Sequence, residues 1–328
     1  MKKIISAVLT AVFAFALVLS AIAAPKKIQV RFAGTEADTT PQSQALHEVA
    51  KRLNASGLFD VKVFTAGSLS NDTDGLVTQA LQGAPIVVPS DPGRIATNQK
   101  VLDYGILMAP YVLKDYRVLD KLIQTPLYKE WEAAFEKNGL KLVTNNWYNG
   151  MRHFITNKQV TKVADLKGLR IRGFGNTIGV TLAKALGYAN MSLPMTEIFS
   201  AVQTKAIDGA EMQIPASYGA RFYEVLKYQA MTSHYMLTSS IVTGAKFFNS
   251  MPKEAQDLFI KTFRDVGTEW QPKVAATEQA NLDAMKKAGL IVSTVDTSKF
   301  EAAVQPYYKE MGFSDAIKNR LLKELSAK

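Results

Sequence analysis

The sequence predicts an α/β protein of about two domains, and three observations lead to this prediction. The chain has 328 residues, of which 47% are apolar, enough for about two domains of roughly 100–200 residues with true cores. Beyond the first two dozen residues, strand-like and helix-like segments alternate, the order typical of parallel sheets covered by helices. A helical pattern over residues 250–289 is long enough to join two lobes.

The first half begins with a strand, a helix and a second strand. Residues 28–33 alternate in polarity like a strand, and Thr40-Pro41 begins a helix whose apolar residues recur at helical spacing. The further elements expected in this half are strand 61–64, helix 72–82, strand 85–88, helices 116–124 and 127–138, and strand 140–145.

A second series of elements begins near Gly150. The long helix of this half starts at Pro252, where the missing N–H costs nothing, and Pro272 in its middle is expected to kink it. The other expected elements are strand 152–156, a helical turn 163–168, strand 169–172, helices 177–186 and 196–204, strands 207–212, 228–233 and 236–242, and, after the long helix, strand 290–295 with two C-terminal helices.

The first 23 residues have the pattern of a secretory signal peptide. Lys2 and Lys3 precede an almost continuous apolar run to residue 19, and Ala21-Ile22-Ala23 gives the small-x-small pattern of a cleavage site. The alternative is an uncleaved membrane anchor, since the apolar run is just long enough to span a bilayer. Because a cleavage site follows at once, we expect an exported, soluble chain that begins at residue 24 or 25.

Composition excludes several kinds of site and partner. The absence of cysteine removes disulfides, cysteine-ligated zinc, iron–sulfur clusters, a cysteine nucleophile and a lipoprotein anchor. Without Lys2 and Lys3 the net charge falls from +10 to +8, and the remaining charges form pairs rather than runs. A nucleic-acid partner is therefore not predicted, whereas a mildly positive cleft would favour anionic small molecules.

Motifs for catalysis are incomplete. His47-Glu48 begins like a zincin motif, but Lys51 stands where the second histidine is needed. The segment 216–219 lacks the leading glycine of a nucleophile elbow. The glycine segment 173–179 lies between a strand and a helix, as a dinucleotide site does, but its strand is charged and lies in mid-chain. The alternative is a turn that allows close backbone approach, so we expect no enzyme, cofactor or metal.

Two arginines at strands of the second half are candidates for anion binding. The planar guanidinium of Arg152 or Arg172 can hold a carboxylate through two parallel hydrogen bonds, which lysine cannot do. A charge-assisted bond contributes about 1.5–3 kcal/mol, a sizeable share of the roughly 8 kcal/mol of micromolar binding. The alternative for each is a surface arginine in a weak salt bridge. Because Arg170 shares a strand face with Arg172, spacing alone does not choose between them.

Several spaced segments resemble, in order, the extracytoplasmic solute receptors of tripartite ATP-independent periplasmic (TRAP) transporters of the DctP type. The segments are residues 150–158, 163–172, 193–204, 207–211 and 222–228 with 232–234. The resemblance extends over essentially the whole mature chain. It implies a two-lobed periplasmic binding protein, type II-like, with hinge strands, an interlobe ligand cleft and a long kinked helix that spans both lobes. Lobe I would comprise residues 24–149 and 238–277, and lobe II residues 150–237 and 278–328.

The resemblance also implies a role as a monomeric receptor. It would capture a small organic acid in the periplasm, close on it, and deliver it to a permease of small and large membrane subunits driven by a sodium gradient. The alternatives are a binding protein of an ABC importer and a secreted hydrolase or oxidoreductase, for which no catalytic constellation is found. A sugar acid, a C4-dicarboxylate and a small hydroxy or keto acid all remain possible ligands.

Individual residues match functional positions of the family. Arg172 matches the arginine that clamps the ligand carboxylate, and Arg152 matches the assisting arginine. In the segment that contains Glu211, Met212 and Gln213 replace the family's Asn-Pro, so that a ligand contact of the asparagine is in doubt unless Gln213 substitutes.

The substrate and the remaining pocket residues are less closely specified. Met195 occupies the position of an aromatic residue in sialic-acid receptors, which argues against that substrate. Further expected pocket residues are Trp147, Asn149, Tyr218 and His234, with Glu36, Asp38 and Asp72 as weaker candidates in the first lobe.

Overall fold

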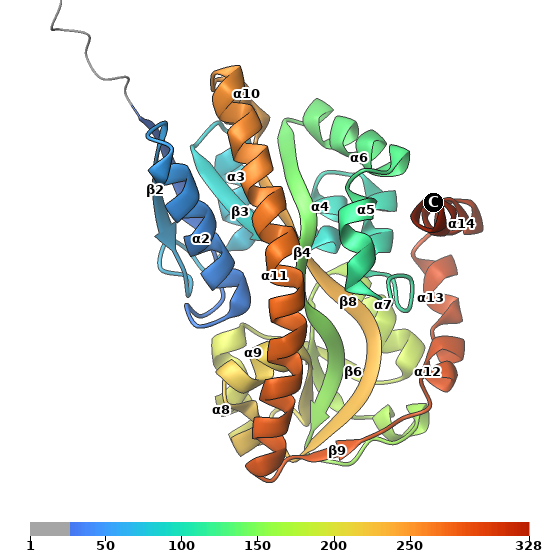
Figure 1. Cartoon of the computed structure of the whole chain (residues 1–328). Coiled ribbons are helices and arrows are strands. Elements are labelled where there is room, and N and C mark those ends of the chain that lie inside the picture. The colour runs from blue at the N-terminus through green and yellow to red at the C-terminus, as the bar shows by residue number, and fades with distance from the viewer. Residues whose placement is uncertain (1–26, 328) are drawn as a thin grey trace, which may run out of the picture.

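The computed structural model describes residues 27–327, and the predicted signal peptide lies outside them (Figure 1). Two α/β lobes are connected by two long strands, β4 (Leu140–Thr156) and β8 (Tyr228–Gly244), and the 35-residue helix α11 (Lys253–Lys287) runs along both lobes. The predicted two-lobed α/β class is therefore confirmed. Within the described part of the chain, no helix combines the length and apolarity needed to cross a membrane.

One sheet extends through both lobes. Its order is β2-β1-β3-β8-β4-β7-β5-β6, and β9 pairs with β8. The outer groups β2-β1-β3 and β6-β5-β7 are parallel, as the alternating sequence predicted. The long central strands are instead antiparallel to each other and to β3 and β7. The shorter strands are β1 (Ile28–Ala33), β2 (Phe59–Phe64), β3 (Ile86–Ser90), β5 (Arg170–Gly173), β6 (Ala189–Ser192), β7 (Gly209–Gln213) and β9 (Ile291–Ser293).

Each long strand corresponds to two shorter strands or segments in the sequence prediction. The sequence predicts strands 140–145 and 152–156 and assigns no strand between them, but in the structure β4 runs through the whole range, and the side chains of Asn145 and Asn146 are buried. Asn145 donates to Thr238 Oγ1 over 3.1 Å and accepts from Ser240 Oγ over 2.8 Å. The pairing of the two strands shifts register at four places. Polar partners on the opposite strand and these bulges let the strand continue where the apolar pattern stops.

Helices cover both lobes. In chain order they are α2 (Pro41–Ala55), α3 (Thr73–Leu81), α4 (Pro92–Asn98), α5 (Leu119–Leu122), α6 (Pro126–Lys137), α7 (Thr177–Leu186), α8 (Ile198–Gln203), α9 (Ile214–Gly219), α10 (Ala245–Asn249), α11, α12 (Thr297–Ala303), α13 (Gln305–Glu310) and α14 (Asp315–Ser326). Short 3-10 turns lie at Leu102–Met108, Tyr116–Val118, Val163–Leu166, Met195–Glu197 and Phe222–Glu224. The sequence predicted two C-terminal helices, and the structure has three.

Helix α11 contributes to the cores of both lobes. Phe259 and Phe263 pack with Phe32 in the core of the first lobe, whereas Leu282 and Met285 belong to the core of the second. Pro272 lies inside the helix without ending it. Because one rigid element is anchored in both cores, the helix fixes the spacing of the lobes along its axis.

The C-terminal segment contacts elements of both lobes. Helix α13 packs against α7, whereas α14 packs against α5 and α6. Arg320 of α14 binds Glu130 of α6, and the Leu127 N–H donates to Glu324 over 3.0 Å. The predicted division assigned residues 278–328 to lobe II, yet α14 lies on helices of the segment assigned to lobe I.

Gly150 marks the point where β4 passes between the lobes. Its φ is +116°, and a Cβ there would lie 2.9 Å from Glu278 Oε1 of α11. The same oxygen accepts the Met151 N–H over 2.9 Å, and the Tyr148 hydroxyl donates to the other carboxylate oxygen. Glycine is required here because the strand turns sharply while it touches the long helix.

We therefore expect Gly150→Ala to lower the free energy of unfolding by roughly 2–4 kcal/mol, through the positive φ and the crowding against Glu278. Gly168→Ala is the matched control, since Gly168 also has positive φ (+77°) but a Cβ there meets nothing within 4 Å. The Gly168→Ala substitution should lower the free energy of unfolding by only about 1–2 kcal/mol. Urea unfolding of both variants checks the difference, and equal losses would contradict crowding at Gly150.

Candidate functional site

A cleft of about 590 Å³ lies between the lobes and is lined by residues of both. Thr35 and Glu36 follow β1, Ser90 ends β3, and Arg172 lies near the end of β5. Ligands of open α/β sheets bind at the carboxyl ends of strands because the loops there can converge on one point. The position of the cleft thus follows from the order of the strands.

Arg172 is a half-buried cation that no described carboxylate pairs with. Its Nε donates to the Leu193 carbonyl over 3.1 Å, which fixes the stem while the guanidinium lines the cleft. Burial, together with the nearby charge of Arg152, lowers the pKa of Arg172 to about 10. The group is still charged at neutral pH, and an anion placed beside it would relieve both effects.

Arg170, on the same strand, has a different environment. Its guanidinium holds both oxygens of Asp208 over 3.0 Å each, outside the cleft lining. The two arginines that spacing leaves equivalent are therefore distinguished by their partners. Arg170 is neutralised by an internal carboxylate, and Arg172 is not.

Arg152 is almost fully buried and bound to a network behind the cleft wall. It forms a bidentate ion pair with Glu211 and donates to Gln213 Oε1 over 2.9 Å. His234 Nε2 lies 3.1 Å from Glu211 Oε1. Burial alone would raise the pKa of Glu211, but Arg152 and His234 lower it to about 2, so the carboxylate is ionised. Of the five N–H groups of Arg152, only one on Nη1 is left for a further acceptor.

Phe174 and Arg152 both line the cleft, and their side chains are in contact. The ring centroid of Phe174 lies 4.5 Å from the guanidinium carbon, a distance at which the cation is attracted to the ring face. The flanking glycines are needed because Cβ atoms on Gly173 and Gly175 would lie 2.4 Å from side-chain oxygens of Asn190 and Ser192. The glycine turn thus allows close packing on β6 and brings Phe174 to the cleft.

The wall contributed by the first lobe is polar. Asp91 caps α4 by accepting the Arg94 N–H over 2.8 Å, and Arg94 also binds Asp74 over 2.8 Å. Ser90 is 5% exposed, and its Oγ has no hydrogen-bond partner among residues 27–327. Glu36 is half-buried beside this wall, and desolvation raises its pKa.

A hydrogen-bonded group connects this wall to the long strands. Gln42 of α2 and Asn149 of β4 both donate to the Ser239 hydroxyl of β8, the latter over 2.6 Å. All three residues line the cleft. Side chains at the crossing strands are thereby held in place at the floor of the site.

The structure brings many of the sequence-predicted residues to the cleft and places two others directly behind it. The residues that line it are Glu36, Asn149, Arg152, Arg172, Met195, Met212 and Gln213. Glu211 and His234 lie behind the wall, in the network that holds Arg152.

The other four expected residues do not line the cleft. Trp147 is buried in the core of the first lobe, where its indole N–H donates to the Phe263 carbonyl over 2.9 Å. Tyr218 is partly exposed and stacks on Tyr223. Asp72 caps α3.

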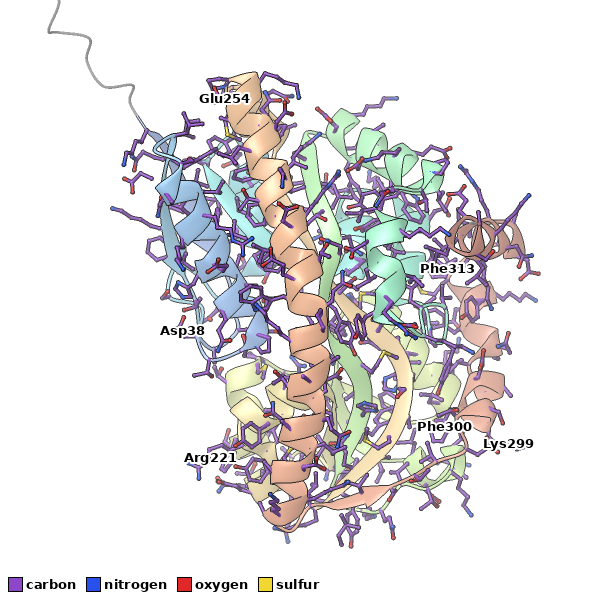
Figure 2. All side chains as sticks on the ribbon, in the orientation of Figure 1. Asp38, Arg221, Glu254, Lys299, Phe300 and Phe313 are labelled. Carbon is purple, nitrogen blue, oxygen red and sulfur yellow. The ribbon has the colours of Figure 1, made fainter. Side chains whose placement is uncertain are left out.

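Asp38 is bound to His47 over 2.7 Å at the outer surface beside α2, where Figure 2 labels it. These four placements have local causes, namely an aromatic core, an exposed ring pair, a helix cap and a surface ion pair. Prediction of each of these four placements would have required knowledge of the residues that surround the side chain in the fold.

Sequence reasoning missed several residues of the cleft. Ser90, Asp91 and Arg94 follow a strand that the sequence did predict, and the Asp-Pro pair at 91–92 is a helix-start signal that marks α4. Gln42 and Phe174 have no such signal. In residues 27–327 no group of three or more metal-ligating side chains is found.

The fold and the cleft define a two-lobed binding protein for small solutes. The chain belongs to the bacterial extracellular solute-binding proteins, family 7 (DctP), whose family model matches residues 32–315. It is therefore a TRAP-type solute receptor by family, as the resemblance predicted.

Characterised relatives and solved structures are similar over most of the chain. The 2,3-diketo-L-gulonate-binding periplasmic protein YiaO of Escherichia coli is 25% identical over 84% of this chain and 85% of its own. The C4-dicarboxylate-binding periplasmic protein DctP of Vibrio cholerae is 26% identical over 83% and 81%.

A TRAP periplasmic solute-binding protein of Actinobacillus succinogenes with bound L-galactonate has a TM-score of 0.84 and 27% identity, over 91% of this chain and 99% of that one. An apo open structure from Escherichia fergusonii has a TM-score of 0.79 and 29% identity, over 89% and 98%.

Proposed function

We propose that this protein is a periplasmic receptor that binds a small organic acid through bidentate contact of its carboxylate with Arg172. The observation that carries the proposal is a half-buried guanidinium on the cleft wall, for which the described part of the chain supplies no carboxylate partner. Partial burial of a charged guanidinium is energetically unfavourable unless an anion is bound beside it. The bound L-galactonate in the similar protein of Actinobacillus succinogenes supports an acid as ligand.

The neighbouring residues have supporting roles in this proposal. Arg152, whose charge is compensated by Glu211, is held in place at the cleft and keeps one N–H for the ligand. Gln213 accepts from Arg152 through its oxygen, so its amide nitrogen is the group that replaces the family's asparagine contact. Met195 and Met212 provide apolar surface at the cleft.

Transport follows from closure of the lobes around the ligand. Contacts from the first lobe form only when the cleft is closed, so the ligand favours the closed state by its differential affinity. We further propose export through the signal peptide of residues 1–23, action as a monomer, delivery to small and large TRAP membrane subunits, and no enzymatic step.

A thermal-shift screen of the mature protein against organic acids tests the proposal. A ligand at about one hundred times its Kd should stabilise the native state by about 2.7 kcal/mol and raise the melting temperature. Arg172→Ala should abolish that shift without lowering the melting temperature of the unliganded protein. A screen in which neutral sugars stabilise the protein and no acid does would contradict the proposal.

A further inference from the structure

The arginines that line the cleft differ in how their charge is compensated. Arg152 is paired with Glu211. Arg94 is paired with two carboxylates, Asp74 over 2.8 Å and Asp91 over 3.2 Å. Among the described residues that line the cleft, Arg172 is the arginine that lacks a carboxylate partner. The cleft therefore has one position where an anion gains a full ion pair.

The remaining ionisable residues of the lining are acidic. Glu36 is half-buried on the first-lobe wall, and Glu197 is exposed at the rim. A second carboxylate of a ligand would meet these groups, Asp91, or the two arginines Arg94 and Arg152, whose charges are already compensated by carboxylates. Transfer of an unpaired carboxylate from water into such a site is unfavourable.

The first-lobe wall offers an unused neutral group instead. Ser90 is 5% exposed and lines the cleft, and its Oγ is buried without a partner in the described structure, so that a rotation about χ1 is needed to turn the hydroxyl toward a ligand. A buried hydroxyl without a partner loses its hydrogen bonds to water. Thr73 and Thr238 are further neutral polar residues of the lining. A ligand hydroxyl, which can both donate and accept, satisfies such a group.

On the basis of the function proposed above, we infer that the ligand is a polyhydroxylated monocarboxylate. Its single carboxylate pairs with Arg172, its remainder is uncharged, and one of its hydroxyls bonds to Ser90 Oγ. The class is that of aldonic and uronic acids, and dicarboxylates are disfavoured. Ser90 is then a specificity-determining residue of the first lobe.

Calorimetry with matched probes tests the charge of the ligand. The gluco and galacto series each supply a neutral sugar, an aldonate, a uronate and an aldarate with two carboxylates, and succinate adds a short dicarboxylate. We expect a monoacid of one series to bind at least about tenfold more tightly than the aldarate of that series and than succinate. A dicarboxylate that binds more tightly than every monoacid would overturn the inference but leave the proposed receptor function intact. Failure of every acid to bind would count against both.

Two variants and one control variant test the residues. Ser90→Ala should weaken the best monoacid about threefold to tenfold, whereas Ser192→Ala, which removes an exposed hydroxyl of the same lining, should change affinity less than about twofold. Equal affinities of the wild type and Ser90→Ala would remove Ser90 from the inference.

Asp74→Asn takes one carboxylate from Arg94 without altering the lining and should reduce the ratio of the affinity for the monoacid to the affinity for the aldarate. An unchanged preference would contradict the charge argument.

Discussion

Replacement of Arg172 by alanine is expected to weaken binding of the native acid by roughly a hundredfold or more, since it removes both hydrogen bonds and the ion pair of the clamp. Arg172→Lys keeps the charge but not the planar fork, and should still lose about tenfold. Isothermal calorimetry with the best acid of the screen measures both effects.

Arg170→Ala is the matched control for this experiment. Arg170 lies two residues away on the same strand, but its guanidinium is bound to Asp208 outside the cleft. Its removal should leave affinity unchanged. If Arg170→Ala and Arg172→Ala weakened binding equally, or if Arg172→Ala bound the acid normally, the clamp would be assigned to the wrong residue.

Glu211→Ala is expected to destabilise the protein by about 3–5 kcal/mol, because it leaves the buried charge of Arg152 without its partner. Glu211→Gln preserves shape and one acceptor and should cost less. Glu224→Ala, which breaks an exposed ion pair with Arg221, should cost no more than about 1 kcal/mol. Urea unfolding of the three variants compares them, and equal losses for Glu211→Ala and Glu224→Ala would refute a structural role of the buried pair.

The buried pair of Glu211 and Arg152 determines part of the dependence of the protein's stability on pH. The folded-state pKa of Glu211 lies below its ordinary value of 4.5, so its contribution to stability is present above pH 4.5 and is lost as the pH falls toward about 2. Burial likewise lowers the pKa of His153 from 6.5 to about 3, so its contribution begins to be lost below pH 6.5. The free energy of unfolding of the wild type should therefore fall as the pH drops below 6.5, because of His153, and again as it drops below 4.5, because of Glu211. Glu211→Gln should show a shallower slope in the lower of these two pH ranges.

The sequence was most informative where the signal is local. Strand β1 and helix α7 have the bounds that the sequence predicts, and helix α2 begins at the predicted Thr40-Pro41 start. The continuity of β4 was not predictable because Asn145 finds its partners on β8, far along the chain. Short α4 contains too few residues for a periodic pattern.

The candidate site shows the same division. The residue type and strand position of Arg172 indicate anion binding, but only its lack of a carboxylate partner separates it from Arg170. Tryptophan is a residue type that is common in ligand pockets, but Trp147 contacts Phe263 of α11 and lies in the core. The missing hydrogen-bond partner of the Ser90 hydroxyl could not be predicted, because the sequence does not show whether the Oγ of a serine is hydrogen-bonded in the folded chain.

The continuous sheet has a mechanical consequence for the proposed transport cycle. Strands β4 and β8 remain hydrogen-bonded to each other across both lobes, with register shifts near the crossing. The closure proposed above would therefore have to change the twist of a paired ribbon and would not be free rotation about a flexible linker. A twisted ribbon resists torsion away from its preferred angle, so we expect the lobes of the empty receptor to return to one separation after release of the ligand.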